Sequence, residues 1–164
     1  MAFVSTRDPA QGRLLLLAAI LFISYLCVAI SLPIVPIFVT GGLKLSNGWA
    51  GFGVGVAFLA TILTRGHAGS LADRRGGKAA VTRGLVCYVA GALISWLAGL
   101  LLAAPWIALL VLVAGRLLLG LGESLVAVGV ISWGIGLVGP ARSGKVLAIT
   151  AVRTGRWARR RASV

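Results

Sequence analysis

Two charged side chains stand inside an apolar run near the end of the chain. Arg116 and Glu123 are the charged residues of the stretch 106–128, and seven residues separate them. On an α-helix, seven residues return to within about 20° of the same face after a rise of about 10.5 Å, so both side chains point the same way. Charges are expensive in hydrocarbon and commonly mark ion or substrate pathways. Glu123 is therefore a candidate proton carrier adjusted by Arg116, and the alternative is a structural Arg–Glu pair.

A second group of polar side chains lies in the first apolar run. Ser24 and Ser31 are also seven residues apart, and Tyr25 is adjacent to Ser24. These three are candidates to line a substrate path. The alternative for each serine is a hydrogen bond to the carbonyl four residues earlier in its own helix. His67 has no second metal ligand nearby in sequence, and we expect it to lie near lipid headgroups.

Other patterns indicate no enzyme chemistry. The segment 139–145 matches the start of a phosphate-binding loop, but Val146 replaces the Ser or Thr that binds magnesium and no strand precedes it. Cys27 and Cys87 lack metal-ligand spacing and are read as small apolar side chains. With no nucleophile beside a base, we predict neither catalysis nor a cofactor.

The composition predicts which solvent surrounds these residues. The chain is 59% hydrophobic, its mean hydropathy is +1.03, and it has three acidic residues against a net charge of +13. Such a chain could not cover its apolar surface with charge in water, and lipid removes that problem. The basic residues lie between the apolar runs and at the ends of the chain. This placement argues against nucleic acid and favours anionic lipid headgroups as the partner.

Four apolar runs are long enough to cross a membrane as helices, because a bilayer core of about 30 Å requires about 20 residues. The predicted spans are 14–39, 49–64, 84–102 and 106–128. Pro33 and Pro36 are expected to kink or end the outer part of the first span. The stretch 129–138 either extends the fourth helix or lies at the interface.

The distribution of Lys and Arg predicts the orientation of these spans. Basic residues precede the first span (residues 1–13), fill the connection 65–83 and follow the fourth span, whereas the opposite side carries only Lys44. Cytoplasmic loops carry the excess of Lys and Arg. We therefore expect a multi-pass protein of the bacterial cytoplasmic membrane with both termini in the cytoplasm.

Small residues four apart suggest faces where the helices pack against one another. Such residues allow helix backbones to approach closely in lipid. The predicted faces are Gly51 and Gly55 in the second span, Gly91, Ser95 and Gly99 in the third, and Gly120 and Ser124 in the fourth.

The connection between the second and third spans carries a recognisable motif. It reads Gly69-Ser70-Leu71-Ala72-Asp73-Arg74-Arg75-Gly76-Gly77-Lys78. This resembles the signature G-x-L-A-D-R-x-G-R-K of the major facilitator superfamily, in its usual place. One departure is Gly77, where the family usually has Arg.

A second motif extends the resemblance. The stretch 116–122 is similar to the family pattern R-x-x-Q-G-x-G, with Leu119 in place of Gln. Segments near residues 32–36, 65–69 and 133–136 look like a bacterial branch related to sugar- and drug-efflux permeases.

The resemblance implies a fold and roles for particular residues. Family members have two bundles of six helices with the substrate held between them. It implies that Asp73 meets a helix N-terminus in the other half and steadies one conformation, together with Gly69, Arg74, Gly76 and Lys78 of the same motif. The Arg at position 116 would take part in proton coupling.

The expected fold is thus an all-α membrane protein, with four helices of a truncated six-helix amino-terminal bundle. Residues 14–152 form the partial membrane domain, and a fifth span begins near residue 145. The basic tail 153–164 is unlike the family and is expected to be cytoplasmic and aberrant, as in a truncated or frame-shifted copy.

The expected function is proton-coupled efflux of a small solute, with the missing half supplied as a separate chain. The alternatives are a complete four-helix multidrug exporter that acts as a dimer, and a remnant that does not transport.

Overall fold

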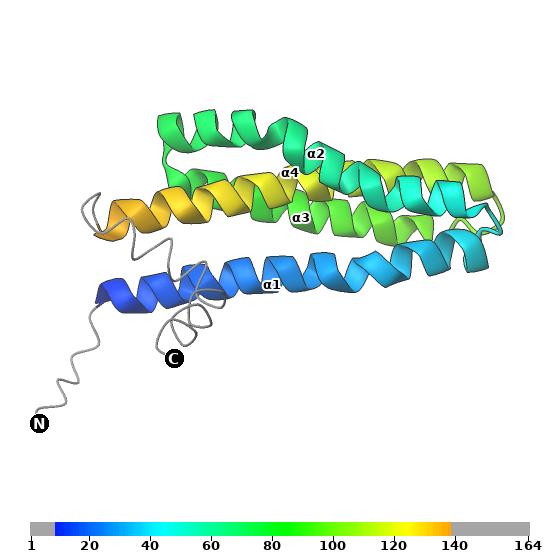
Figure 1. The fold of residues 1–164 in the computed structure, drawn as a ribbon, viewed down its shortest axis with the longest axis horizontal. Helices are drawn as coiled ribbons and strands as arrows, with labels where there is room; N and C mark the ends of the chain where they lie inside the picture. The colour runs from blue at the N-terminus through cyan, green and yellow to red at the C-terminus, as the bar shows by residue number, and fades with distance from the viewer. Residues whose placement is uncertain (1–8, 139–164) are drawn as a thin grey trace, which may run out of the picture.

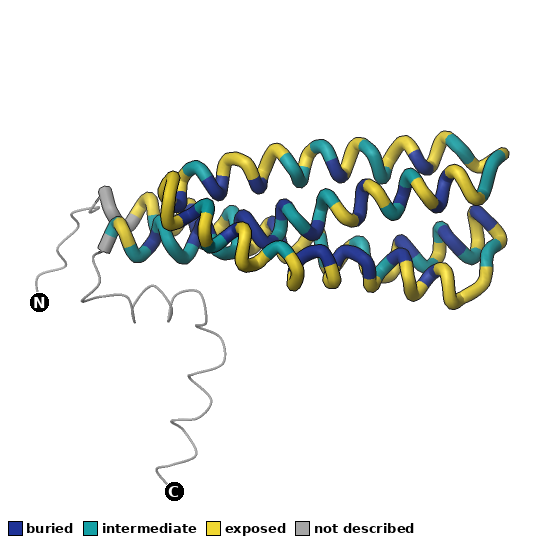
Figure 2. The backbone as a smooth tube through the Cα atoms, turned by 90° about the horizontal axis from the view of Figure 1, so that it is seen from above, coloured by how far each residue is buried: buried dark blue, intermediate teal, exposed yellow. Residues whose placement is uncertain are grey.

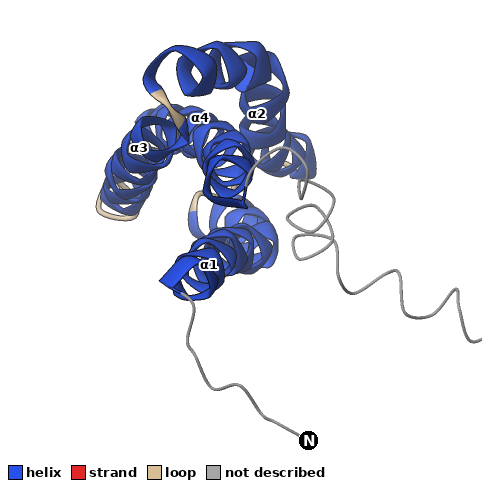
Figure 3. Cartoon of the chain, turned by 90° about the vertical axis from the view of Figure 1, so that its left-hand side faces the viewer, coloured by secondary structure: helices blue, strands red, loops and turns tan. Residues whose placement is uncertain are grey.

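The computed structural model describes residues 9–138, and these form a bundle of long helices (Figure 1). The helices are α1 (Pro9–Ile37), the π-helical turn η1 (Phe38–Gly42), α2 (Asn47–Arg75), α3 (Gly77–Ala98) and α4 (Pro105–Val138). Four segments are long and apolar enough to cross a membrane. Over the described residues the secondary structure is helical, with short turns and no strand (Figure 3). The predicted all-α fold with four membrane helices is confirmed.

α1 continues without a break past its two prolines and is followed by a π-helical turn, which is wider than an α-helix. Pro33 and Pro36 lie inside α1, and the chain continues as η1 without a break. Proline has no N–H to donate within the helix, and such positions are commonly accommodated by local changes of helix type. Here the Thr40 hydroxyl donates to the Pro36 carbonyl at 2.8 Å. The outer part of the first span therefore changes its winding and stays helical to Gly42.

The connection between α2 and α3 is shorter than the sequence suggests. α2 extends to Arg75 and α3 begins at Gly77, so most of the basic segment 65–83 is helical. Gly76 alone turns the chain, with a φ of 84° that side-chain-bearing residues rarely adopt. The family motif is thus the end of one helix, a one-residue turn and the start of the next. The stretch 129–138 likewise continues α4.

α3 and α4 are in backbone contact along their length. Each helix carries three glycines spaced seven residues apart on the contacting face: Gly77, Gly84 and Gly91 on α3, and Gly115, Gly122 and Gly129 on α4. A Cβ atom built at Gly84 would lie 2.9 Å from the Gly122 carbonyl oxygen, and one at Gly91 would lie 2.8 Å from that of Gly115. Small residues permit this approach in lipid, where dispersion contacts replace the hydrophobic effect between helices.

The small-residue faces predicted from the sequence have mixed outcomes. Gly91 lies at the α3–α4 contact, and Gly120 packs against the backbone of Ala57 on α2. Gly51 and Gly55 do not mark a contact between helices within residues 9–138, because no neighbouring atom of this part of the chain lies within 4 Å of a Cβ at either position. Spacing alone does not reveal which face of a helix meets a neighbour, and glycine is abundant in this chain.

α1 stands apart from the three other helices over much of its length (Figures 1 and 3). It is attached at both ends by apolar clusters. Val35, Val39 and Leu43 pack with residues of α2 and α4 at one end, and Leu17 packs with α3 and α4 at the other. Between these clusters, the middle of α1 leaves space inside the bundle.

Exposed and buried positions alternate along every helix (Figure 2), and many exposed residues are large and apolar, as expected of lipid-facing surfaces.

The α3–α4 contact generates a prediction for Gly84→Ala. The added methyl group would press on Gly122 and Val126 of α4, at 2.9 Å and 2.7 Å from their nearest atoms. We expect a loss of about 1–3 kcal/mol in the free energy of unfolding, typical of overpacking. Denaturation in mixed micelles, followed by circular dichroism, measures it. The matched control is Gly55→Ala, whose methyl group meets open space and should raise helix propensity. Equal stability of the two variants would contradict the contact.

Candidate functional site

Arg116 lies at the point where α1, α2 and α4 meet. Its side chain is 3% exposed. The Nε–H group donates to the Gly53 carbonyl of α2 at 3.3 Å, and Nη1 donates to the Ser31 hydroxyl of α1 at 2.8 Å. Ser31 in turn donates to the Val28 carbonyl at 2.7 Å. One side chain of α4 therefore bonds two other helices, and both of its acceptors are uncharged.

Glu123 is half-buried two turns further along α4. Its Oε2 atom lies 3.3 Å from the Thr61 hydroxyl of α2. Thr61 also lies within hydrogen-bonding distance of the Ala57 carbonyl, at 3.0 Å, and the Gly120 carbonyl, at 3.1 Å. A hydroxyl carries one hydrogen, so Thr61 donates to one of these three acceptors at a time. It can thus turn toward or away from the carboxylate.

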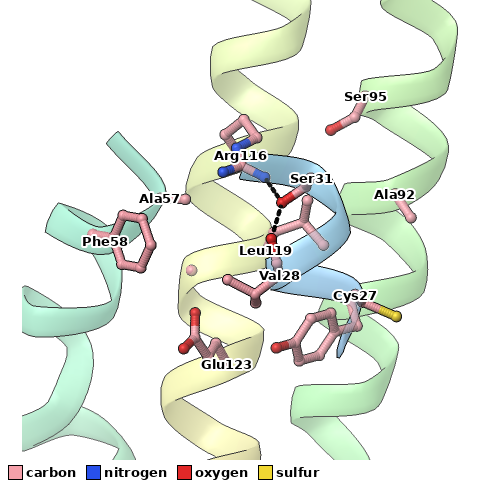
Figure 4. Close-up of a pocket in the computed structure, with 12 residues that line it drawn as sticks. Cys27, Val28, Ser31, Ala57, Phe58, Ala92, Ser95, Arg116, Leu119 and Glu123 are labelled. Atoms are coloured by element: carbon pink, nitrogen blue, oxygen red, sulfur yellow. Dashed lines mark hydrogen bonds between the residues drawn. The ribbon is translucent and has the colours of Figure 1, made fainter. Parts of the chain in front are cut away.

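Arg116 and Glu123 face one cavity without forming an ion pair. They come from the same face of α4, as the spacing predicts, but no carboxylate oxygen of the described residues lies within 4.0 Å of the guanidinium. Figure 4 shows Arg116 bonded to Ser31 with Glu123 further along the helix. The cavity has a volume of about 250 Å³. The following residues line it: Cys27, Val28, Ser31, Ala57, Phe58, Tyr88, Ala92, Ser95, Arg116, Leu119, Gly120 and Glu123.

A second cavity of about 340 Å³ adjoins the first on the other side of Arg116. The two cavities share Cys27, Ser31, Ser95, Arg116 and Leu119. The second cavity lies between α1, α3 and α4 and is lined otherwise by apolar and aromatic side chains: Ile30, Ile34, Val35, Phe38, Trp96, Gly99 and Leu112. Glu123 does not line it. The bonded pair of Arg116 and Ser31 therefore separates a cavity with an acid from a cavity without one.

The structure brings only some of the sequence-predicted polar residues to the cavities. Ser31 lines both. Ser24 is buried and donates to the Ile20 carbonyl at 2.9 Å, and it lines neither cavity. Tyr25 is 49% exposed and also lines neither cavity. His67 is exposed near the end of α2.

Several residues of the site were not predicted. Thr61 and Ser95 are polar residues within apolar helices, which was the available signal, although Ser95 was read only as a packing residue. Tyr88 is an aromatic residue of α3 whose hydroxyl is buried without a hydrogen-bond partner among the described residues. The Gly53 carbonyl gives no sequence signal, because any residue presents a backbone oxygen.

The motif residues lie at the opposite end of the helices from η1. Asp73, Arg74 and Lys78 are exposed, and Gly69 is partly buried. No ion pair joins Asp73 to the basic residues around it in the described part of the chain. An acid in the last turn of a helix also interacts unfavourably with the dipole of that helix.

The packing of α3 against α4 explains why Gly77 stands where the family motif usually has Arg. Gly77 is buried, and a Cβ at this position would lie 2.6 Å from the Gly129 carbonyl oxygen of α4. The arginine that the family usually carries would therefore force α3 and α4 apart. The glycine is required by the close packing of this helix pair.

The remaining sequence predictions are tested only in part or not at all. Residues 9–138 contain no group of three side chains placed to bind a metal, and both cysteines are free. The phosphate-loop-like segment 139–145, the start of a fifth span and the basic tail 153–164 lie outside the described residues, as do residues 1–8.

The fold and the site define a class of protein. Four apolar helices surround a buried arginine, a glutamate and two small cavities, and the outer surface is apolar. This is a multi-pass membrane protein with polar groups in the interior of its bundle.

Known proteins with similar sequences identify the family. The chain is 36% identical over 149 residues to "Uncharacterized MFS-type transporter STM4428" of Salmonella typhimurium, a match that covers 91% of this chain and 38% of the relative. It is 38% identical to "Uncharacterized MFS-type transporter YhhS" of Escherichia coli and 42% identical to "Uncharacterized MFS-type transporter BURPS1106A_3201" of Burkholderia pseudomallei, each over 81% of this chain and 33% of the relative. No family model matches, and no solved structure matches.

The sequence therefore corresponds to an amino-terminal portion of a major facilitator superfamily (MFS) protein, and the predicted family is confirmed. The chain spans slightly more than a third of the length of the first of these relatives and a third of the other two.

The bond between Arg116 and Ser31 generates a prediction for Ser31→Ala. The variant leaves one guanidinium N–H of a buried cation without its acceptor, which should cost about 1–3 kcal/mol. Ser24→Ala is the matched control, because the Ser24 hydroxyl donates to the Ile20 carbonyl of its own helix and does not contact Arg116. Unfolding of both variants in mixed micelles gives the comparison. Equal losses in the two variants would show that Ser31 does not hold Arg116.

Proposed function

We propose that this chain acts as part of an MFS transporter that exports a small solute across the bacterial cytoplasmic membrane in exchange for protons. The observation that carries the proposal is the cavity lined by both Arg116 and Glu123 within the membrane helices. The family membership supports it, since the similar proteins are named as transporters. Proton coupling, direction and solute belong to the proposal alone.

Glu123 is the proton carrier in this proposal. With Arg116 positively charged, an ionised Glu123 gives the pair a net charge of zero, and a protonated Glu123 leaves a net charge of +1. Charge inside the bundle is costly unless it is compensated. Proton uptake would therefore change the relative free energies of conformations that expose the cavity to different sides. Thr61 would donate to the ionised carboxylate and turn to a backbone carbonyl when the carboxyl is protonated.

The motif at the α2–α3 turn would act as the conformational switch. Asp73 is exposed and has no partner in the described helices. An acid in such a position can meet the positive N-terminal end of a helix outside this bundle. Gly76 makes the turn that presents it, and Gly69, Arg74 and Lys78 of the same motif lie on the two helices that the turn joins.

The proposal also includes the orientation of the helices, that is, which of their ends face the cytoplasm. Lys44 lies after η1, and the motif with its cations lies at the other end of α2. The excess of Lys and Arg favours a cytoplasmic motif and an outward-facing Lys44, with anionic headgroups near the basic residues. The greater length of the relatives favours this proposal over a small four-helix exporter.

Infrared spectroscopy of the reconstituted chain tests the proton site. A protonated carboxyl group absorbs apart from the carboxylate, and the chain has only three acidic side chains. We expect the protonated-carboxyl band to contain a component at the frequency of a carboxyl group in an apolar cavity, and we expect Glu123→Gln to lose this component. Asp73→Asn is the control: it should lose the component of a water-exposed carboxyl group and retain that of Glu123. A band with no component lost in Glu123→Gln at any pH would remove Glu123 from the coupling mechanism.

Cysteine labelling in intact cells tests the orientation. Lys44→Cys and Lys78→Cys replace exposed residues just before α2 and in the first turn of α3, in a chain whose two native cysteines are changed to alanine. A membrane-impermeant maleimide should label position 44 directly and position 78 only after permeabilisation. Equal labelling of both positions in intact cells would rule out the proposed sidedness.

A further inference from the structure

Arg116 forms no ion pair with an acid among the described residues, and Glu123 lies further along the same helix. The Arg116 side chain is 3% exposed, and its hydrogen-bond acceptors are the Ser31 hydroxyl and the Gly53 carbonyl. A guanidinium carries five N–H donors, and these two bonds use two of them. Buried charges are normally paired, because an isolated one loses its hydration without repayment. The remaining donors are therefore available to a negatively charged ligand.

The cavity between α1, α3 and α4 combines this cation with apolar walls. Phe38, Trp96 and Leu112 are among its lining residues, and its volume is about 340 Å³. Besides Arg116, the polar groups among the lining side chains are few: the hydroxyls of Ser31 and Ser95, which already donate to the Val28 and Gly91 carbonyls, the indole N–H of Trp96 and the weakly polar thiol of Cys27. Small-molecule sites range from about 300 to 1,000 Å³, so this cavity takes a small ligand.

The same lining argues against a strongly hydrated ligand. A sugar would bring more hydroxyl groups than the few polar groups of these walls can bond, and the remaining hydroxyls would lose their hydrogen bonds to water. A carboxylate or similar group would use a single strong anchor, since arginine can bind it with two parallel hydrogen bonds. The rest of the ligand would then be aromatic or aliphatic.

The position of Glu123 favours an anion in this cavity rather than in the adjoining one. Glu123 lines the 250 Å³ cavity and not the 340 Å³ cavity. A carboxylate ligand beside Glu123 would face like-charge repulsion, and on the other side of Arg116 it would not meet an acid in the cavity wall.

We propose that the cavity between α1, α3 and α4 binds a small organic anion with an apolar body, anchored by Arg116. This rests on the proposed function, because the anion would be the transported solute. Ile34 and Trp96 line the cavity and are 54% and 65% exposed, so the cavity opens toward the outer surface of the helices. That opening suits a ligand whose body partitions into lipid.

Equilibrium binding to the full 164-residue chain in a non-ionic detergent tests this proposal. The probe is radiolabelled benzoate, and the competitors are unlabelled benzoate, the neutral isostere benzamide and the cation benzamidine. We expect benzoate to compete at least tenfold better than benzamide, and benzamidine to compete least. Equal competition by benzoate and benzamide would show an apolar cavity without anion recognition and would overturn the proposal.

Two variants locate the binding site. Arg116→Gln should weaken benzoate binding at least tenfold and abolish the preference over benzamide. Ile34→Trp should block binding by filling the cavity without replacing Arg116, and its matched control is Ile62→Trp, at an exposed position that lines neither cavity. If Arg116→Gln fails to fold, Ile34→Trp still tests the proposal. Benzoate binding that survives Ile34→Trp would place the anion elsewhere and overturn the proposal.

The result of the benzoate-binding experiment can be distinguished from the result of the infrared experiment on Glu123. Benzoate binding depends on Arg116 and the α1–α3 side, whereas the infrared band depends on Glu123. Loss of anion binding with an intact Glu123 band would reject the solute class and leave the proton site standing. Anion binding without a Glu123 band would retain the solute class and reject the coupling.

Discussion

The backbone contact between α3 and α4 is the constraint on which the rest of the structure depends. Glycines at seven-residue spacing on both helices leave no Cβ atom at the points where the two backbones approach most closely. α2 packs directly on α4, and α1 is held by apolar clusters at its ends and by the Arg116–Ser31 hydrogen bond between them. The space left beside the middle of α1 is where Arg116 and Glu123 point. The cavities are thus a consequence of how tightly the other helices associate.

Arg116 gives this arrangement its polar interior, although its bonds are to neutral groups. Its contacts with Ser31 and Gly53 connect α4 to two neighbours, so the arginine has a structural role whether or not it binds a ligand. The absence of a direct Arg116–Glu123 ion pair leaves both groups able to respond to what enters the cavities. A direct pair would satisfy both charges and leave neither free to recognise a ligand.

The sequence predicted the four membrane helices well, because hydrophobic run length is a direct consequence of bilayer thickness. It also predicted that Arg116 and Glu123 share a face, since helical geometry fixes that relation. Gly51 and Gly55 mark no contact between helices within residues 9–138, because spacing does not identify the neighbouring helix. Thr61 and the Gly53 carbonyl escaped prediction, since their roles depend on which helices meet in space.

The one-residue turn at Gly76 has a mechanical consequence. α2 and α3 are joined with no slack, and α3 is locked to α4, so a tilt of any one of them carries the other two. α1 is connected to α2 through the π-helical turn η1 and residues 43–46, which is a longer connection than the single residue between α2 and α3. The bundle thus consists of three helices joined directly to one another and of α1, which has the longer connection and reaches the others through its end clusters and Ser31. Any change in the position of α1 would alter both cavities at once, because α1 supplies lining residues to each.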